Sequence, residues 1–122
     1  MAPRVRLTHE FTLESAHSLP SLPDGHKCRR VHGHSFVIEV HVEGEVDPAM
    51  GWLMDYADLQ KSFDPLHAAL DHRLLNEVEG LENPTSENLA VWIWRRLKPS
   101  LEPLSEVVVH ETCQARCSYR GE

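Results

Sequence analysis

Residues 28–36 read CRRVHGHSF, in which a cysteine stands four residues before the first histidine of a His-Gly-His triplet. Side chains two positions apart point to the same side of an extended chain, so His32 and His34 can present both imidazoles to one face. Gly33 between them lets the backbone come close to a neighbour. This spacing predicts a chelating pair. A catalytic zinc site needs a third protein ligand and keeps one position open for water or substrate.

His17 is the candidate for the third ligand. Residues 5–17 alternate apolar and polar side chains, as in a half-buried strand, and His17 ends that stretch. If this strand pairs with the strand that follows the triplet, their ends meet and the three imidazoles converge. Histidine donors suit zinc, although nickel or copper would bind the same set. The alternative is that all three are ordinary core or surface histidines.

Cys28 lies between Lys27 and Arg29, beside the predicted metal. Cationic neighbours and a nearby dication favour the thiolate, which makes Cys28 a candidate base or nucleophile. A fourth metal ligand and an inert buried thiol remain the alternatives.

Two further stretches carry carboxylates suited to acid–base chemistry or ligand binding. Asp71 and His72 end the first predicted helix and are an acid–base candidate, because a carboxylate can orient or charge an imidazole. Adjacent residues on a helix do not simply face each other, however. Glu111 lies in the apolar stretch VVVHET, predicted to be a strand, where a carboxylate is unfavourable unless exposed or paired. It can accept two adjacent N–H donors, as a pterin or guanine edge presents, or it can face solvent.

The elements that must position these residues follow from the periodicity of the sequence. Alternating side chains predict four strands, over residues 5–17, 36–44, 107–112 and 118–120. Helical spacing predicts one helix within residues 54–75 and a second within residues 80–101, capped by Thr85 or Ser86. Strands segregated from helices indicate an α+β fold, with one domain over residues 1–122, an antiparallel sheet and both helices on one face.

Composition and charge narrow the function. No apolar run approaches the roughly 20 residues that a membrane span needs, and the N-terminus lacks the apolar segment of a signal peptide, so we expect a cytoplasmic protein with no membrane partner. A net charge of −7 opposes nucleic-acid binding. Nine histidines exceed what 122 residues need for packing, so we expect chemistry on a small molecule. Sheet edges that need covering favour an oligomer.

Six segments together resemble the 6-pyruvoyl-tetrahydropterin synthase family: FTLESAHSL, CRRVHGHSF, GWLMDYADL, LDHRLLNE, NPTSENLAVWIW and VVVHETCQARCSYRGE. Within the family, the chain most resembles the bacterial 6-carboxy-5,6,7,8-tetrahydropterin synthase branch, because the interval of three residues between Cys28 and the triplet is similar to the interval in that branch. That branch implies a zinc-dependent lyase that converts 7,8-dihydroneopterin triphosphate into 6-carboxytetrahydropterin, acetaldehyde and triphosphate, in the route to queuosine and related deazapurines. The family's tunnelling fold implies a four-stranded antiparallel sheet with two helices on one face. It also implies trimers that close a barrel of strands and stack into a homohexamer.

The resemblance also implies a role for each site residue. His17, His32 and His34 would hold zinc, Cys28 would accept a proton, Asp71 and His72 would form a relay pair, and Glu111 would grip the pterin ring. Thr85 and Glu87 would lie near the pterin, and Lys27, Arg29 and Arg30 would meet the triphosphate. Family sites lie between subunits, so Cys28 and His72 need not act in the same chain's pocket.

Three alternatives to this function remain. One is a pyruvoyl-type synthase that eliminates triphosphate without carbon–carbon cleavage, and another is a non-catalytic pterin- or metal-binding homologue. A metal-dependent hydrolase has less support, because no glutamate follows the histidines as a general base.

Overall fold

The computed structural model describes residues 2–122. Two long strands come first, then two helices, then two shorter strands, in the order that the periodicity predicts. Their bounds are β1 Arg4–His17, β2 His32–Glu45, α1 Tyr56–Leu70, α2 Ser86–Leu97, β3 Leu104–His110 and β4 Arg116–Tyr119. Three short 3₁₀ turns lie between them: η1 Lys27–Arg29, η2 Leu75–Glu77 and η3 Lys98–Ser100.

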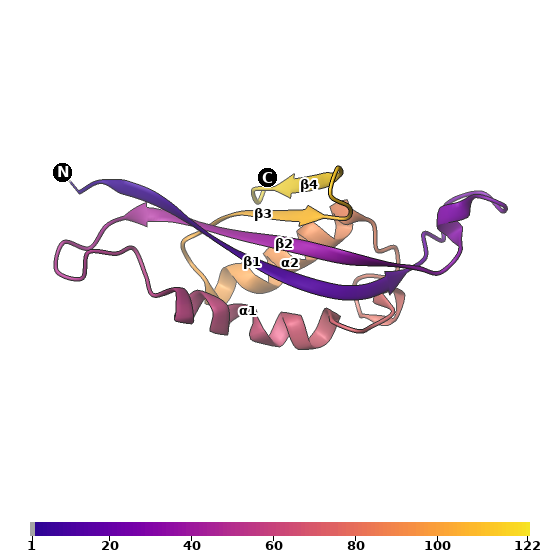
Figure 1. Ribbon diagram of the computed structural model, residues 1–122, viewed down its shortest axis with the longest axis horizontal. Coiled ribbons are helices and arrows are strands. Elements are labelled where there is room, and N and C mark those ends of the chain that lie inside the picture. Colours follow the sequence, from indigo (N-terminus) through magenta and orange to yellow (C-terminus); the bar gives the residue numbers. More distant parts are fainter. Residues whose placement is uncertain (1) are drawn as a thin grey trace.

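The four strands form one antiparallel sheet in the order β1-β2-β3-β4, and both helices lie on one face of it (Figure 1). This confirms the α+β class and the single helical layer. β1 and β2 pair along their whole length, from Arg4 opposite Glu45 to His17 opposite His32. The end of β1, the start of β2, the end of α1 and the β3–β4 turn all lie at the same end of the sheet (Figure 1).

The core lies between the sheet and the helices. Alternate residues of β1 and β2, such as Leu13 and Phe36, point toward the helices and are fully buried, because successive side chains of a strand face opposite sides. The helices contribute apolar stripes, in α1 Leu59, Phe63, Leu66 and Leu70 and in α2 Leu89, Ala90, Trp92, Ile93 and Leu97. Asp55 caps α1 by accepting from the backbone N–H of Ala57, and Thr85 caps α2 by accepting from that of Asn88.

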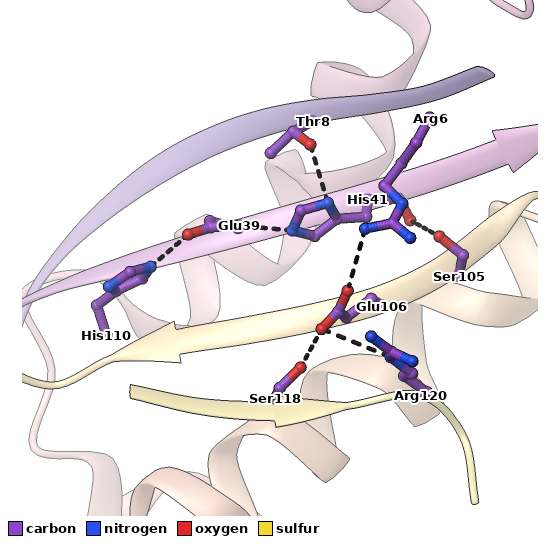
Figure 2. A network of polar contacts seen from close by, with 9 residues as sticks. All are labelled: Arg6, Thr8, Glu39, His41, Ser105, Glu106, His110, Ser118 and Arg120. Atoms are coloured by element: carbon purple, nitrogen blue, oxygen red, sulfur yellow. Dashed lines mark hydrogen bonds and ion pairs between the residues drawn. The ribbon is translucent and has the colours of Figure 1, made fainter. Parts of the chain in front are cut away.

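The opposite face of the sheet, here called the outer face, carries a polar network instead of helices (Figure 2). Nε2–H of His41 donates to Glu39 over 2.8 Å, and Nδ1 of the same ring lies 2.8 Å from the Thr8 hydroxyl. The second oxygen of Glu39 accepts from Nε2 of His110. Burial by itself would raise the pKa of Glu39, but the hydrogen bonds from His110 and His41 outweigh it and hold this pKa below its usual value.

All four strands differ in their bounds from the prediction, and the differences in β2 and β3 affect the site. β2 begins four residues earlier than residue 36, because the polar stretch from His32 to Ser35 still pairs with β1. β3 ends at His110, so the prediction that Glu111 lies within a strand is wrong. The backbone N–H groups of Glu111 and Thr112 both donate to the carbonyl of Ala115, which closes the turn to β4. Among residues 2–122, no helix has the length and apolar character needed to cross a membrane.

Candidate metal centre and active site

The three histidines predicted as ligands converge at one end of the sheet. His17 ends β1 directly opposite His32, which begins β2, and His34 lies two residues further on the same face. One ring nitrogen from each lies within 4.8 Å of the others, and this is the only such group of potential metal ligands found in residues 2–122. Three imidazoles on two paired strands form a site that can hold a metal ion and leave a position open for a further ligand.

Backbone carbonyls fix two of the imidazoles. Nδ1 of His17 lies 2.8 Å from the carbonyl oxygen of Pro84, and Nδ1 of His32 lies 2.8 Å from that of Arg30. A carbonyl only accepts, so each Nδ1 carries a proton and each Nε2 is the nitrogen that can bind a metal. Such a partner on the far ring nitrogen is the usual support of a metal-binding histidine.

The environment of Nε2 of His17 is suited to binding a cation. Its Nε2 is buried and has no hydrogen-bond partner, and the nearest charged atom is Oε1 of Glu111 at 3.4 Å, another acceptor. A buried acceptor that faces a half-buried carboxylate oxygen is unfavourable unless a cation lies between them or beside them. Burial lowers the pKa of His17, against the hydrogen bond to Pro84, which raises it. The imidazole therefore stays in the neutral form that metals require.

Cys28 lies beside the histidines on the 3₁₀ turn η1, where its backbone N–H donates to Nδ1 of His26 over 3.1 Å. It lines a depression of about 360 Å³ together with Leu19, Lys27, His32, His34 and Glu111. The thiol is half-buried, and its sulfur is not part of the group of mutually close ligand atoms found in residues 2–122. The structure thus brings Cys28, Glu111 and Lys27 to the metal position.

Asp71 and His72 contact each other even though they are adjacent in sequence. Asp71 caps the C-terminus of α1, and His72 has a φ of 56°, in the left-handed region that residues other than glycine rarely adopt. This turn directs the ring back, so that Nδ1 of His72 donates to Oδ2 of Asp71 over 2.8 Å and leaves Nε2 free to accept a proton. A hydrogen bond from the backbone N–H of Glu14, then the one from His72, lower the pKa of Asp71. It remains an anion.

His72 does not line the depression that holds Cys28. It lines a second depression, of about 480 Å³, with Arg73, Gly33 and His34. His34 borders both depressions, but Cys28 and His72 are not brought together within this chain. Gly33 is not needed for close approach here, because a Cβ built on it would lie 3.7 Å from its nearest neighbour, the carbonyl oxygen of Ser15.

The other predicted binding residues do not line the depression that holds Cys28. Arg29 is held inside its own loop, with Nη1 2.7 Å from the Leu22 carbonyl and 3.4 Å from Asp24. Thr85 follows Pro84, and its hydroxyl caps α2. Glu87 lies in the first turn of α2, and burial and then the charge of Glu87 raise the pKa of Cys117 on β4. Neither Thr85 nor Glu87 lines the two depressions described above.

The sequence interpretation missed the groups that orient the site. The carbonyls of Pro84 and Arg30 and the backbone of Glu14 are main-chain atoms, so residue types and spacing gave no signal for them. Only the pairing of segments far apart in the chain reveals these contacts.

Comparison with known proteins identifies the family of the chain. Residues 6–122 match the family described as 6-pyruvoyl tetrahydropterin synthase. The chain is 43% identical to 6-carboxy-5,6,7,8-tetrahydropterin synthase from Synechocystis sp., over 90% of this chain and 88% of the relative. It is 36% identical to dihydroneopterin monophosphate aldolase from Pyrococcus furiosus, over 80% of this chain and 79% of the relative.

Among solved structures, 6-pyruvoyl tetrahydropterin synthase from Caenorhabditis elegans matches with a TM-score of 0.92 and 31% identity, over 99% of this chain and 98% of that one. This confirms the tunnelling fold of the subunit, with four antiparallel strands and two helices. The chain therefore belongs to the 6-pyruvoyl tetrahydropterin synthase family.

Proposed function

We propose that the protein is a zinc-dependent lyase that converts 7,8-dihydroneopterin triphosphate into 6-carboxy-5,6,7,8-tetrahydropterin, with release of acetaldehyde and triphosphate. The observation that carries the proposal is the convergence of three histidine ligands beside Cys28 and Glu111 in one depression. The likeness to a relative named for the same product supports the carboxy-forming reaction and, with it, a place in queuosine and deazapurine biosynthesis.

The residues of the depression have complementary tasks in this reaction. Glu111 accepts the paired N–H groups of the pterin ring, which directs the substrate side chain toward the histidines 3.4–3.8 Å from its carboxylate. Zinc, when bound, polarises the side-chain oxygens and acidifies the neighbouring C–H bonds. Cys28, on the wall of the same depression, accepts a proton from the substrate. Lys27 contributes positive charge for the triphosphate, whereas Arg29 is tied to its loop.

His72 supplies a second acid–base group. Asp71 holds the proton on Nδ1, so the exposed Nε2 is the atom that accepts a proton from the substrate. We propose that His72 serves a pocket of a neighbouring copy in a homohexamer, since Cys28 and His72 line different depressions within one chain. The edge of β4 and the edge of β1 before Thr12, which no other strand covers in residues 2–122, would then close a barrel between copies. Thr85 and Glu87 would approach the pterin in that assembly.

Product analysis tests the proposal. The zinc-loaded protein is incubated with 7,8-dihydroneopterin triphosphate and an aldehyde trap, and the products are identified by mass spectrometry. We expect 6-carboxytetrahydropterin and trapped acetaldehyde. A pyruvoyl side chain without aldehyde would support the second candidate, the reaction named for the Caenorhabditis elegans protein, and would refute carbon–carbon cleavage.

A pair of cysteine variants tests whether the site is catalytic. Removal of an acid–base group lowers turnover by a factor of about 10² to 10⁴. We expect such a loss in Cys28→Ala with zinc content unchanged. Cys113→Ala is the matched control, because that thiol is exposed and lies outside the depression of Cys28. Equal, measurable turnover of Cys28→Ala and the parent would assign the base to another group, and absence of turnover in both would favour the non-catalytic alternative.

A further inference from the structure

The Asp71–His72 pair occupies an exposed and strained position that needs support. The side chain of His72 is 77% exposed, and its left-handed backbone conformation carries a penalty for a residue with a Cβ. Such a conformation persists only where the surrounding structure holds it. In residues 2–122, this support comes from the last third of β1.

Two backbone–backbone hydrogen bonds, and one from the backbone to the Asp71 side chain, join β1 to the segment after α1. The N–H of Glu14 donates to Oδ1 of Asp71 over 2.9 Å, and the N–H of His72 donates to the carbonyl of Glu14 over 2.7 Å. One step further, the N–H of Ala16 donates to the carbonyl of Arg73 over 3.0 Å, and Ala16 forms a parallel bridge with Leu74. The segment from Asp71 to Leu74 thus lies along the edge of β1.

Ser15 adds the side-chain hydrogen bond that fixes the end of α1 against β1. Its hydroxyl donates to the carbonyl of Leu70, the last residue of α1, over 2.6 Å, and Ser15 is only 5% exposed. The last carbonyls of a helix have no partner within the helix, so a buried one needs a donor from elsewhere. Leu70 directly precedes Asp71, and the position of its carbonyl therefore sets where the pair begins.

We propose that Ser15 is a positioning residue for the Asp71–His72 pair. By holding the end of α1 on β1, its hydroxyl brings the Asp71 carboxylate to the N–H of Glu14 and keeps His72 turned so that Nδ1 donates to Asp71. This inference rests on the proposed function, in which Nε2 of His72 exchanges protons with the substrate. It also makes β1 the common support of the site, since His17, two residues after Ser15, is a predicted metal ligand on the same strand.

Ser15→Ala tests the inference through both kinetics and the tautomer of His72. We expect kcat to fall about tenfold, less than a complete loss of an acid–base group would give, with KM within a factor of two of the parent and zinc content unchanged. Ser15→Thr keeps the hydroxyl and should recover most of kcat. Ser62→Ala is the matched control, because the Ser62 hydroxyl also donates to a carbonyl of α1, that of Asp58 at 3.0 Å, but far from His72 in the helix.

The imidazole nitrogen NMR signals of His72 give an independent measurement. In the parent, at a pH where the ring is neutral, we expect the proton on Nδ1, the nitrogen that faces Asp71. In Ser15→Ala this preference should weaken toward a mixture of both tautomers. A variant that melts at a lower temperature but keeps the parent's kcat and tautomer would reduce Ser15 to an ordinary helix-end contact and overturn the inference.

A parallel His72→Ala variant separates this inference from the proposed function. If His72→Ala turns over as fast as the parent, the acid–base role of His72 fails. The tautomer in Ser15→Ala then decides by itself whether Ser15 positions the pair.

Discussion

Metal binding should stabilise the folded protein by an amount that the geometry of His17 allows us to estimate. Without a cation, the buried Nε2 of His17 has no hydrogen-bond partner, a situation that costs about 1–3 kcal/mol. Zinc at about 100 times its Kd adds about 2.7 kcal/mol to the free energy of unfolding, which is of the same size. Unfolding entropy is about 2.1 cal/mol/K per residue. Over 122 residues this converts the gain into a rise in Tm of about 10 °C.

The assay is thermal unfolding of the metal-free protein with and without added zinc. We expect the parent to show the full rise in Tm, and His32→Ala to lose most of it, because a site with two ligands binds zinc much more weakly. His32 is only half-buried, so its removal disturbs packing less than removal of His17 would.

His9→Ala is the matched control for this assay. His9 also lies on β1, where its ring stacks on Phe11 with centroids 4.5 Å apart, but it is outside the histidine group. Loss of this stacking should lower Tm with and without zinc by similar amounts and leave the zinc-dependent rise intact. An equal zinc-dependent rise in His32→Ala and the parent would refute the three-histidine site, as would no rise in the parent.

Two further predictions concern substrate charge and pH. Lys27→Ala should raise KM for the triphosphate substrate about tenfold, whereas Arg29→Ala should raise it less, because Arg29 is bonded to Leu22 and Asp24. Steady-state kinetics of both variants measure this difference. A larger increase in KM for Arg29→Ala would contradict the prediction. On the outer face, the lowered pKa of Glu39 means that its carboxylate stabilises the folded state above its ordinary pKa of about 4.5, and that this contribution is lost as the pH falls through the lowered value. Glu39→Gln should therefore unfold at a lower urea concentration than the parent at pH 6. It should also lose less stability than the parent between pH 6 and pH 3. The same difference in urea midpoint between the two proteins at every pH would disprove this prediction.

Local patterns predicted the elements because each has one apolar face. Alternation in residues 5–17 and 36–44 and the stripes of the two helices reflect burial against one shared core, so their type and order could be derived from the sequence. The predicted strand boundaries were less accurate where polar residues extend a strand beyond its apolar part. The start of β2 at His32 depends on pairing with the end of β1, and no apolar alternation marks it.

Glu111 shows a similar limit. The apolar residues before it predict a strand that continues through Glu111. In the structure, however, Glu111 belongs to the turn to β4, and its carboxylate points toward His17 and His34. Hydrogen bonds within residues 111–115, not hydrophobicity, decide this.

By itself, the sequence predicted the group of three histidines, the thiol near them and the fold class, because these follow from the spacing of side chains along single strands and helices. The tertiary structure alone decided how they work together. It set the tautomers of His17 and His32 through distant carbonyls, turned His72 back onto Asp71, and separated His72 from the depression of Cys28. The physical reason is that main-chain donors and acceptors, identical in nearly every residue, acquire a role only when folding brings distant segments together.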